Sequence, residues 1–191
     1  MSEKKRTKTQ RAILHAAKGL YEKHGVGSVP FDDIAEAAGV CRTTVFNHFA
    51  DAGELQAALA VAEIGDLIDF CSRSDKRGLE LIEALLDQLI SDTVNYPRVM
   101  ARLTNATILG GDAGRVAEIE RIIARHYEVE FGKFPESAPV SAALLAEMTM
   151  GMYYGQVNHL LAHGLPFDAE SMRRDMRAML NCMLRCVQTK E

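Results

Sequence analysis

Five polar side chains within one short stretch of the sequence could together bind a nucleic acid. They are Arg42, Thr43, Thr44, Asn47 and His48. Such side chains form hydrogen bonds with phosphate oxygens and with base edges in the major groove. At helical spacing they lie opposite Val45 and Phe49, which are apolar. The pattern predicts a short helix with a polar face toward DNA; an ordinary helical hairpin with a polar surface is the alternative.

A second short helix and a tight turn must position this polar face. Residues 31–49 read FDDIAEAAGVCRTTVFNHF, with apolar Ile34 and Ala35 before Gly39. Glycine can adopt positive φ without a Cβ penalty, so Gly39 predicts a turn between two helices. Small Ala35 lets the two helices approach closely. The segment therefore predicts a helix-turn-helix, whose second helix enters the major groove.

Helices are also predicted on both sides of this segment. The upstream stretch TKTQRAILHAAKGLYEKH is amphipathic and ends at Gly25, and a long helix begins after Phe49 with the sequence ADAGELQAALA. The order of first helix, glycine, IAEAAGV turn, TTVFNHF helix and "EL" helix resembles the N-terminal domain of the tetracycline-repressor (TetR) family. The resemblance implies a DNA-binding domain at residues 1–52 and an effector-binding and dimerisation domain at residues 53–191.

Several residues depart from the usual pattern of that family. Cys41 and Pro30 stand where Ser or Thr commonly caps a helix, and Phe46 stands where Tyr is frequent. Ala52 and Gly53 replace a common Lys-Glu pair. These changes leave the fold prediction intact and bear on the strength and sequence of the DNA target.

Charge is distributed unevenly along the chain. The formal net charge is −4, yet residues 1–50 hold eight Lys and Arg against five Asp and Glu. Lys4, Lys5 and Arg6 are the predicted phosphate contacts of a basic arm. A solvated N-terminus with no role in binding is the alternative.

The remainder of the sequence is helical in pattern. About nine helices and no strand are expected, which predicts an all-α protein with a C-terminal helical bundle. The final helix carries apolar residues at four-three spacing, the pattern of a helix that packs nearly parallel to another. We predict a four-helix dimer interface that includes Met172, Met176, Met179, Leu180, Met183 and Leu184. Burial in the monomer core is the alternative, and a homodimer would read a palindromic operator.

The family resemblance also implies an effector pocket between the DNA-binding end and this seam. Met, Tyr and a few polar groups there suit a small apolar effector with one or two hydrogen bonds. The candidate lining is Met100, Leu103, Thr104, His126, Tyr127, Met148, Met152, Tyr153 and Gln156. A filled core is the alternative for most of these residues.

Composition and motifs exclude several other classes. Hydrophobic residues make up 48% and charged residues 25% of the chain, which is typical of a folded protein. No signal-peptide or membrane-spanning pattern is present, so a cytoplasmic location is expected. His159 and His163 share a helix face, but no ligand spacing surrounds them, and no catalytic motif stands out. We predict no enzymatic activity, no metal and no cofactor.

The resemblance to the TetR family, together with the polar face and the basic arm, thus implies a homodimeric transcriptional repressor that a small apolar effector releases from a palindromic operator. The alternative is a helical-bundle protein that binds a ligand or senses redox state, with weak or lost DNA binding. In the redox case the reactive thiols would be Cys41, or Cys182 with Cys186.

Overall fold

The computed structural model describes residues 3–108, 113–134 and 140–188. Over these residues the chain forms nine α-helices and no strand, which confirms the predicted all-α class. The helices are α1 (Glu3–His24), α2 (Phe31–Ala37), α3 (Arg42–His48), α4 (Ala52–Arg73), α5 (Gly78–Asn95), α6 (Pro97–Ile108), α7 (Ala113–Phe131), α8 (Ala142–Ala162) and α9 (Ala169–Gln188). Within the described residues, no helix is long and apolar enough to cross a membrane.

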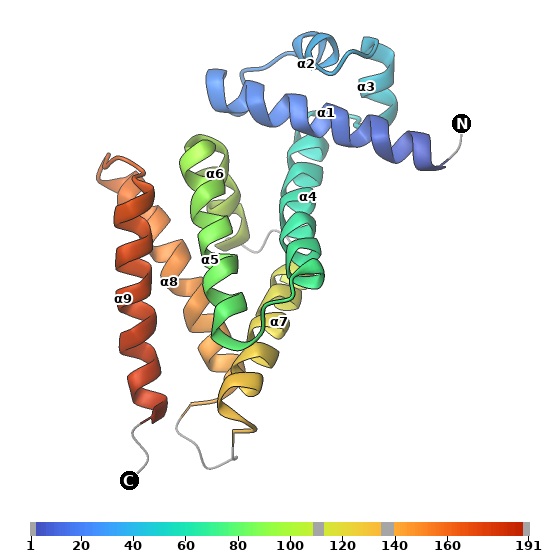
Figure 1. The fold of residues 1–191 in the computed structure, drawn as a ribbon. Helices are drawn as coiled ribbons and strands as arrows, with labels where there is room; N and C mark the ends of the chain where they lie inside the picture. Colours follow the sequence, from blue (N-terminus) through green and yellow to red (C-terminus); the bar gives the residue numbers. More distant parts are fainter. Residues whose placement is uncertain (1–2, 109–112, 135–139, 189–191) are drawn as a thin grey trace.

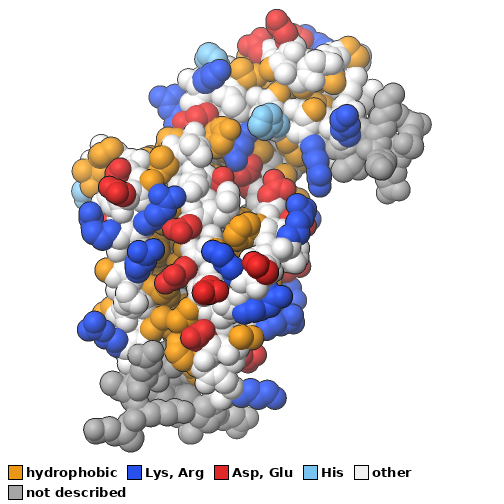
Figure 2. All heavy atoms as spheres, viewed as in Figure 1, with side chains coloured by type: hydrophobic (Ala, Val, Ile, Leu, Met, Phe, Trp, Pro, Cys, Tyr) orange, Lys and Arg blue, Asp and Glu red, His pale blue; other side chains and the backbone are white. Residues whose placement is uncertain are grey.

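Helices α1 to α3 form a small unit at one end of the molecule, and α5 to α9 form a bundle at the other (Figure 1). Helix α4 begins in the small unit and runs down into the bundle, while α8 and α9 lie side by side at its far side (Figure 1). On the face drawn in Figure 2, acidic and basic side chains are interspersed over the bundle. Helix α4 is therefore the covalent connection between the two ends.

Buried apolar side chains divide into two clusters. The smaller one joins α1, α2 and α3 to the first turns of α4, through residues such as Ile13, Val45 and Leu55, and also takes in Val99 of α6. The larger one fills the bundle and begins on α4 at Leu67. Each end of the molecule thus has a core of its own.

The hydroxyl groups of two buried tyrosines in the larger core find the same kind of hydrogen-bond partner. The Tyr127 hydroxyl lies 2.7 Å from Oγ1 of Thr149, and Tyr153 lies 2.9 Å from Oγ1 of Thr93. Each threonine hydroxyl donates to the carbonyl four residues earlier on its own helix, so each tyrosine hydroxyl donates to the threonine. These bonds fix the register of α7 against α8 and of α5 against α8.

Helix α9 packs its apolar stripe into this same core. Five of the residues predicted for the dimer interface are at most 7% exposed in the single chain: Met172, Met176, Leu180, Met183 and Leu184. Met179 is partly buried against them. Because α5 and α8 already cover this stripe within one chain, these side chains belong to the monomer core. Any dimer contact by α9 must use its outer face.

Candidate nucleic-acid interface

The turn between α2 and α3 is closed by backbone hydrogen bonds. Gly39 has φ of 67°, and its N–H donates to the carbonyl of Glu36 at 3.1 Å. The N–H of Val40 donates to the carbonyl of Ala35 at 2.9 Å. This pair of bonds is the Schellman ending of a helix, which needs positive φ at the position of Gly39. The predicted helix-turn-helix is therefore present, and Gly39 sets its angle.

Helix α3 shows a buried side and a polar side. Val45 is fully buried, as is Phe49 just after the helix, and both pack in the smaller core. The predicted DNA-binding side chains lie on the other side, where Arg42, Thr43 and Asn47 are exposed and Thr44 and His48 are half-buried. The local sequence thus places five polar groups within reach of a double helix lying on this surface.

The structure adds partners for Arg42 that the spacing alone did not identify. Its Nη1 lies 2.7 Å from Oδ2 of Asp32 in α2, and its guanidinium lies 5.4 Å from the ring centroid of Phe46. The Phe46 ring packs in turn 5.0 Å from Phe31 and stays 44% exposed. Two contacts therefore hold the guanidinium on the exposed face. In the sequence, Asp32 stands out only as an acidic residue in the first turn of α2. Such a residue stabilises the helix dipole, so its position did not indicate a pairing with Arg42.

Cys41 precedes α3 and caps it without a side-chain hydrogen bond to the backbone. Its Sγ lies 3.1 Å from Oγ1 of Thr43 and 2.9 Å from Oγ1 of Thr44. These two hydrogen bonds lower the pKa of the exposed thiol to about 7. The thiol thus contacts two of the predicted DNA-binding side chains.

The basic arm lies mainly outside the described side chains. Lys4, Lys5 and Arg6 are among the side chains that the structure does not describe. Further along α1, Lys8 and Arg11 are exposed. These two residues extend the basic segment along the described part of α1.

A second candidate site is a cavity of about 50 Å³ inside the bundle, between α4, α5, α6, α7 and α8. Four of the residues predicted for the effector pocket line it: Met100, Leu103, Thr104 and Tyr153. Sequence reasoning missed several others, including Glu63, Leu67 and Tyr154. These come from helices whose approach depends on tertiary packing and not on local spacing.

The other predicted pocket residues lie elsewhere. Tyr127 is in the core with Thr149, and Gln156 donates to the carbonyl of Met172 in α9 at 3.4 Å. Met148 is 43% exposed on the outer face of α8, and Met152 is half-buried. His126 is not in the cavity either: its Nδ1 accepts the N–H of Gly78 at 3.1 Å and so caps the start of α5.

The three-helix unit, its Schellman turn and the polar face of α3 define a helix-turn-helix DNA-binding protein. Residues 13–59 match the profile of the family described as "Bacterial regulatory proteins, tetR family". The chain is 30% identical over 94 residues to the HTH-type transcriptional regulator AcrR of Shigella flexneri. That alignment covers 47% of this chain and 44% of AcrR, so it spans less than half of that relative.

The fold resembles solved structures over its whole length. A TetR-family transcriptional regulator from Pectobacterium atrosepticum superposes with a TM-score of 0.72 at 16% identity, covering 100% of this chain and 99% of that one. SmeT, the repressor of the Stenotrophomonas maltophilia multidrug efflux pump SmeDEF, superposes with a TM-score of 0.65 at 20% identity, covering 92% and 88%. Residues 13–59 therefore match the DNA-binding domain of TetR-family transcriptional regulators, and the whole chain shares the fold of solved structures from that family. The alternative of a helical-bundle protein that binds a ligand or senses redox state, with weak or lost DNA binding, is not favoured.

Proposed function

We propose that this protein is a cytoplasmic, non-enzymatic repressor that binds a palindromic operator as a homodimer and leaves it when a small effector binds. Residues 1–52 would act as the DNA-binding domain and residues 53–191 as the effector-binding and dimerisation domain. The exposed polar face of α3, opposite buried Val45 and Phe49, is the observation that carries the proposal. A dimer would place two such faces about 34–36 Å apart, in successive major grooves.

The outer face of α8 supports dimerisation. Leu144 and Met148 are 41% and 43% exposed there, and Gly151 and Gly155 continue the same face with no side chain to hold a partner away. Exposed apolar side chains in a row are typical of an interface. On α9, Ala178 and Cys182 are exposed and small enough for close helix approach. These residues replace the buried methionine stripe as the proposed seam.

The dimer seam can be tested with one buried charge. We expect Met148→Glu to convert a dimer into a monomer in light scattering after size exclusion, because the carboxylate would be desolvated in the interface. Val129→Glu is the matched control, since Val129 is 58% exposed on α7. A native protein that is monomeric at all concentrations would contradict the proposed dimer.

The DNA-binding role can be tested by selecting bound fragments of the source genome near physiological salt. We expect the native protein to enrich an inverted repeat, and Arg42→Ala with Thr44→Ala to weaken binding by about 1–3 kcal/mol for each base interaction that is removed. Arg174→Ala, at an exposed site on α9, is the control. Equal enrichment by native and doubly substituted proteins would show that α3 does not read the operator.

The basic arm predicts a specific salt effect. Replacing Lys4, Lys5 and Arg6 by Ala should reduce the slope of log affinity against log salt by about 0.9 for each phosphate that the arm no longer neutralises. The measurement is fluorescence anisotropy of the selected fragment over a salt series. An unchanged slope would mean that the arm does not bind DNA.

A further inference from the structure

One carboxylate is shared by two hollows of this molecule. Glu63 of α4 lines the small cavity in the bundle and also the cleft of about 780 Å³ between α1, α4 and α7. Among the described residues that line the cavity, Glu63 alone carries a charge. Most of the wall is apolar and includes Leu67, Leu89 and Ile119. A single carboxylate in an apolar wall discriminates strongly between ligands of different charge.

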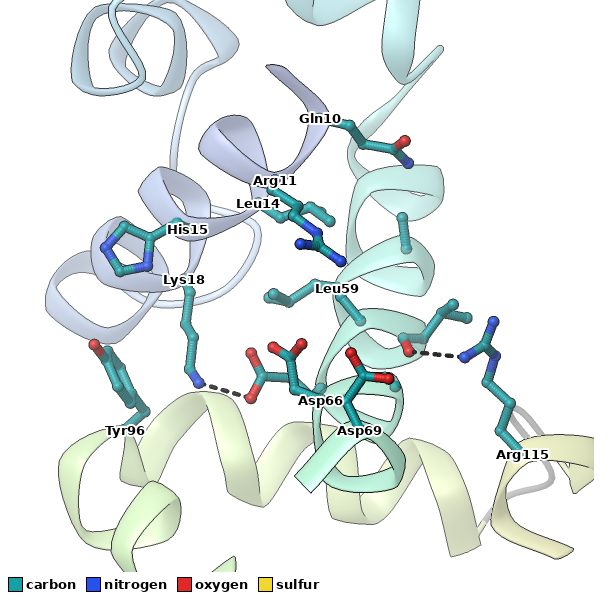
Figure 3. A pocket seen from close by; sticks show the side chains of 15 residues that line it. Gln10, Arg11, Leu14, His15, Lys18, Leu59, Asp66, Asp69, Tyr96 and Arg115 are labelled. Carbon is teal, nitrogen blue, oxygen red and sulfur yellow. Dashed lines mark hydrogen bonds and ion pairs between the residues drawn. The ribbon is translucent and has the colours of Figure 1, made fainter. Parts of the chain in front are cut away.

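On the cleft side, Lys18 of α1 already shows how this carboxylate binds an ammonium group. Its Nζ lies 2.7 Å from Oε2 of Glu63, and the two side chains are only 12% and 16% exposed (Figure 3). The same Nζ lies 4.3 Å from the ring centroid of Tyr96. A carboxylate and an aromatic face together form a cage for a cationic nitrogen. Figure 3 shows Lys18 reaching down from α1 to this site.

The lining of the cavity also includes two aromatic rings. Tyr153 and Tyr154 line the cavity there, with ring centroids 5.6 Å apart. Burial raises the pKa of Glu63, and the charges of Asp92 and Asp66 raise it further, while Lys18 opposes the rise. Arg115 lies on the cleft side, where it donates to the carbonyl of Val61 at 3.5 Å. No Lys or Arg is among the described residues that line the cavity, so a Glu63 carboxylate turned toward it would need a cation from the ligand.

We propose that the effector of this protein is an apolar molecule with a cationic nitrogen, and that this nitrogen binds Glu63 in place of Lys18. The inference rests on the proposed function, because it names the effector class of the cavity that the proposed repressor would use. An anionic effector would find no Lys or Arg among the described residues that line the cavity, and an unpaired anion is costly in an apolar wall. A neutral effector would leave the ion pair with Lys18 as it is.

The size of the cavity couples ligand entry to the DNA-binding end. A volume of about 50 Å³ is well below that of pockets for small-molecule ligands, which span roughly 300–1,000 Å³. An effector must therefore separate α4 from α6 and α7 as it enters. Because Glu63 lies on α4 and Lys18 on α1, turning the carboxylate toward the effector removes the ion pair that fixes α1 against α4. The exchange of cations at Glu63 thus transmits ligand binding to the helix-turn-helix.

The first test measures binding without DNA, by calorimetry on the full-length native protein. The probes are phenylpropylammonium and phenylpropyltrimethylammonium, with phenylpropanol as the neutral analogue and phenylbutanoate as the anion. We expect the cations to bind at least about tenfold more tightly than the neutral probe, because a desolvated charge pair is formed. Equal affinity for cation and neutral analogue, or no binding of either cation, would overturn the inference.

Two matched variants of α4 locate the cation. Glu63→Gln should weaken the binding of both cations by about tenfold or more, whereas Asp66→Asn should change it by less than about threefold. Asp66 is exposed, lines the cleft and not the cavity, and loses the same charge. Equal losses in both variants would place the cation in the open cleft and overturn the inference. If Glu63→Gln does not fold, the comparison of probes on the native protein still decides.

The second test asks whether the cation acts through Lys18. Saturating phenylpropyltrimethylammonium should weaken binding of the selected operator by the native protein by about tenfold, within the usual range of allosteric coupling. In Lys18→Met, the same cation should weaken operator binding by a smaller factor, since the ion pair that the cation breaks is already absent. Cation binding through Glu63 with an unchanged operator affinity would contradict release by this effector class and leave the cation site standing. Operator binding without cation binding would reject the inference and leave the DNA-binding role standing.

Discussion

The two ends of this molecule carry polar groups in opposite ways. On α3, Arg42, Thr43 and Asn47 are exposed and backed by a small apolar core. At the junction of the two ends, the polar side chains of Lys18 and Glu63 are mostly buried and bound to each other. Exposed groups are available to an external partner at little cost. The buried ion pair, in contrast, must separate before either of its groups can bind a partner. The difference separates the surface that we propose reads DNA from the pair that we propose responds to an effector.

The comparison requires that the small core fold as a unit of its own, and Phe49→Ala tests this most severely. The side chain is 2% exposed in that core, so its truncation should cost about 3–5 kcal/mol of unfolding free energy. We expect denaturant unfolding followed by circular dichroism to become biphasic, with α1 to α3 unfolding before the bundle. Operator binding should disappear with the first phase.

Phe46→Ala provides the control on the same helix. That ring is 44% exposed, so its removal should change stability by less than about 1 kcal/mol. A single cooperative transition for Phe49→Ala would show instead that both cores unfold together. Equal destabilisation by the two substitutions would contradict the buried and exposed sides assigned to α3.

The core of the bundle is tested by Thr149→Val. Valine removes the acceptor of the buried Tyr127 hydroxyl, which should cost about 1–3 kcal/mol because that donor is left unsatisfied. The double variant with Tyr127→Phe should recover part of the stability, since neither partner then remains unpaired. Additive effects in denaturant unfolding would mean that the hydroxyl pair is not coupled. Operator affinity should stay unchanged in both variants, because the DNA-binding end is untouched.

The sequence predicted these two regions with unequal success, for a physical reason. Gly39, Val45 and Phe49 specify the helix-turn-helix through interactions within about ten residues, and such local patterns are visible in one sequence. The pair of Lys18 and Glu63 is separated by 45 positions and depends on how α1 meets α4. No periodicity records that approach, so the joint was not predicted.

The predicted pocket and seam show the same limit. Met172 and Met176 have the spacing of a helix seam, and they do form one, but with α5 and α8 of the same chain. Spacing tells which face of a helix is apolar and not which partner covers it. Likewise His126 has the chemistry of a ligand-binding residue, yet its Nδ1 accepts a hydrogen bond from the first N–H of α5.

A smaller effect is expected where α1 meets α6. Oε2 of Glu22 accepts the N–H groups of Arg98 and Val99 at 3.0 and 3.2 Å, and so caps the start of α6 from another helix. Glu22→Gln should cost about 0.5–2 kcal/mol, the usual range for a helix cap. Differential scanning calorimetry should show the transitions of the two ends moving apart, with exposed Glu36→Gln as the control. An unaltered thermogram would mean that this cap does not join the two ends.

The smallest effect should come from pH, at the far end of the bundle. Burial, with a smaller contribution from the charges of Arg77 and Arg125, lowers the pKa of His126 below 6.5. Folding therefore favours the neutral ring, whose Nδ1 accepts from Gly78. This stabilisation is complete above pH 6.5 and is lost as the pH falls through the folded pKa, because protonation removes the acceptor.

A variant without a titrating ring isolates this contribution of His126. Denaturant unfolding at pH 7.5 and pH 5 should show the native protein losing about 0.5–1.5 kcal/mol more than His126→Gln on acidification. His15→Gln, at an exposed position on α1, should lose as much as the native protein. A constant difference between native protein and His126→Gln at both pH values would contradict the cap. Operator binding should follow none of these changes, since His126 lies on α7, far along the chain from the helix-turn-helix, and serves only the start of α5.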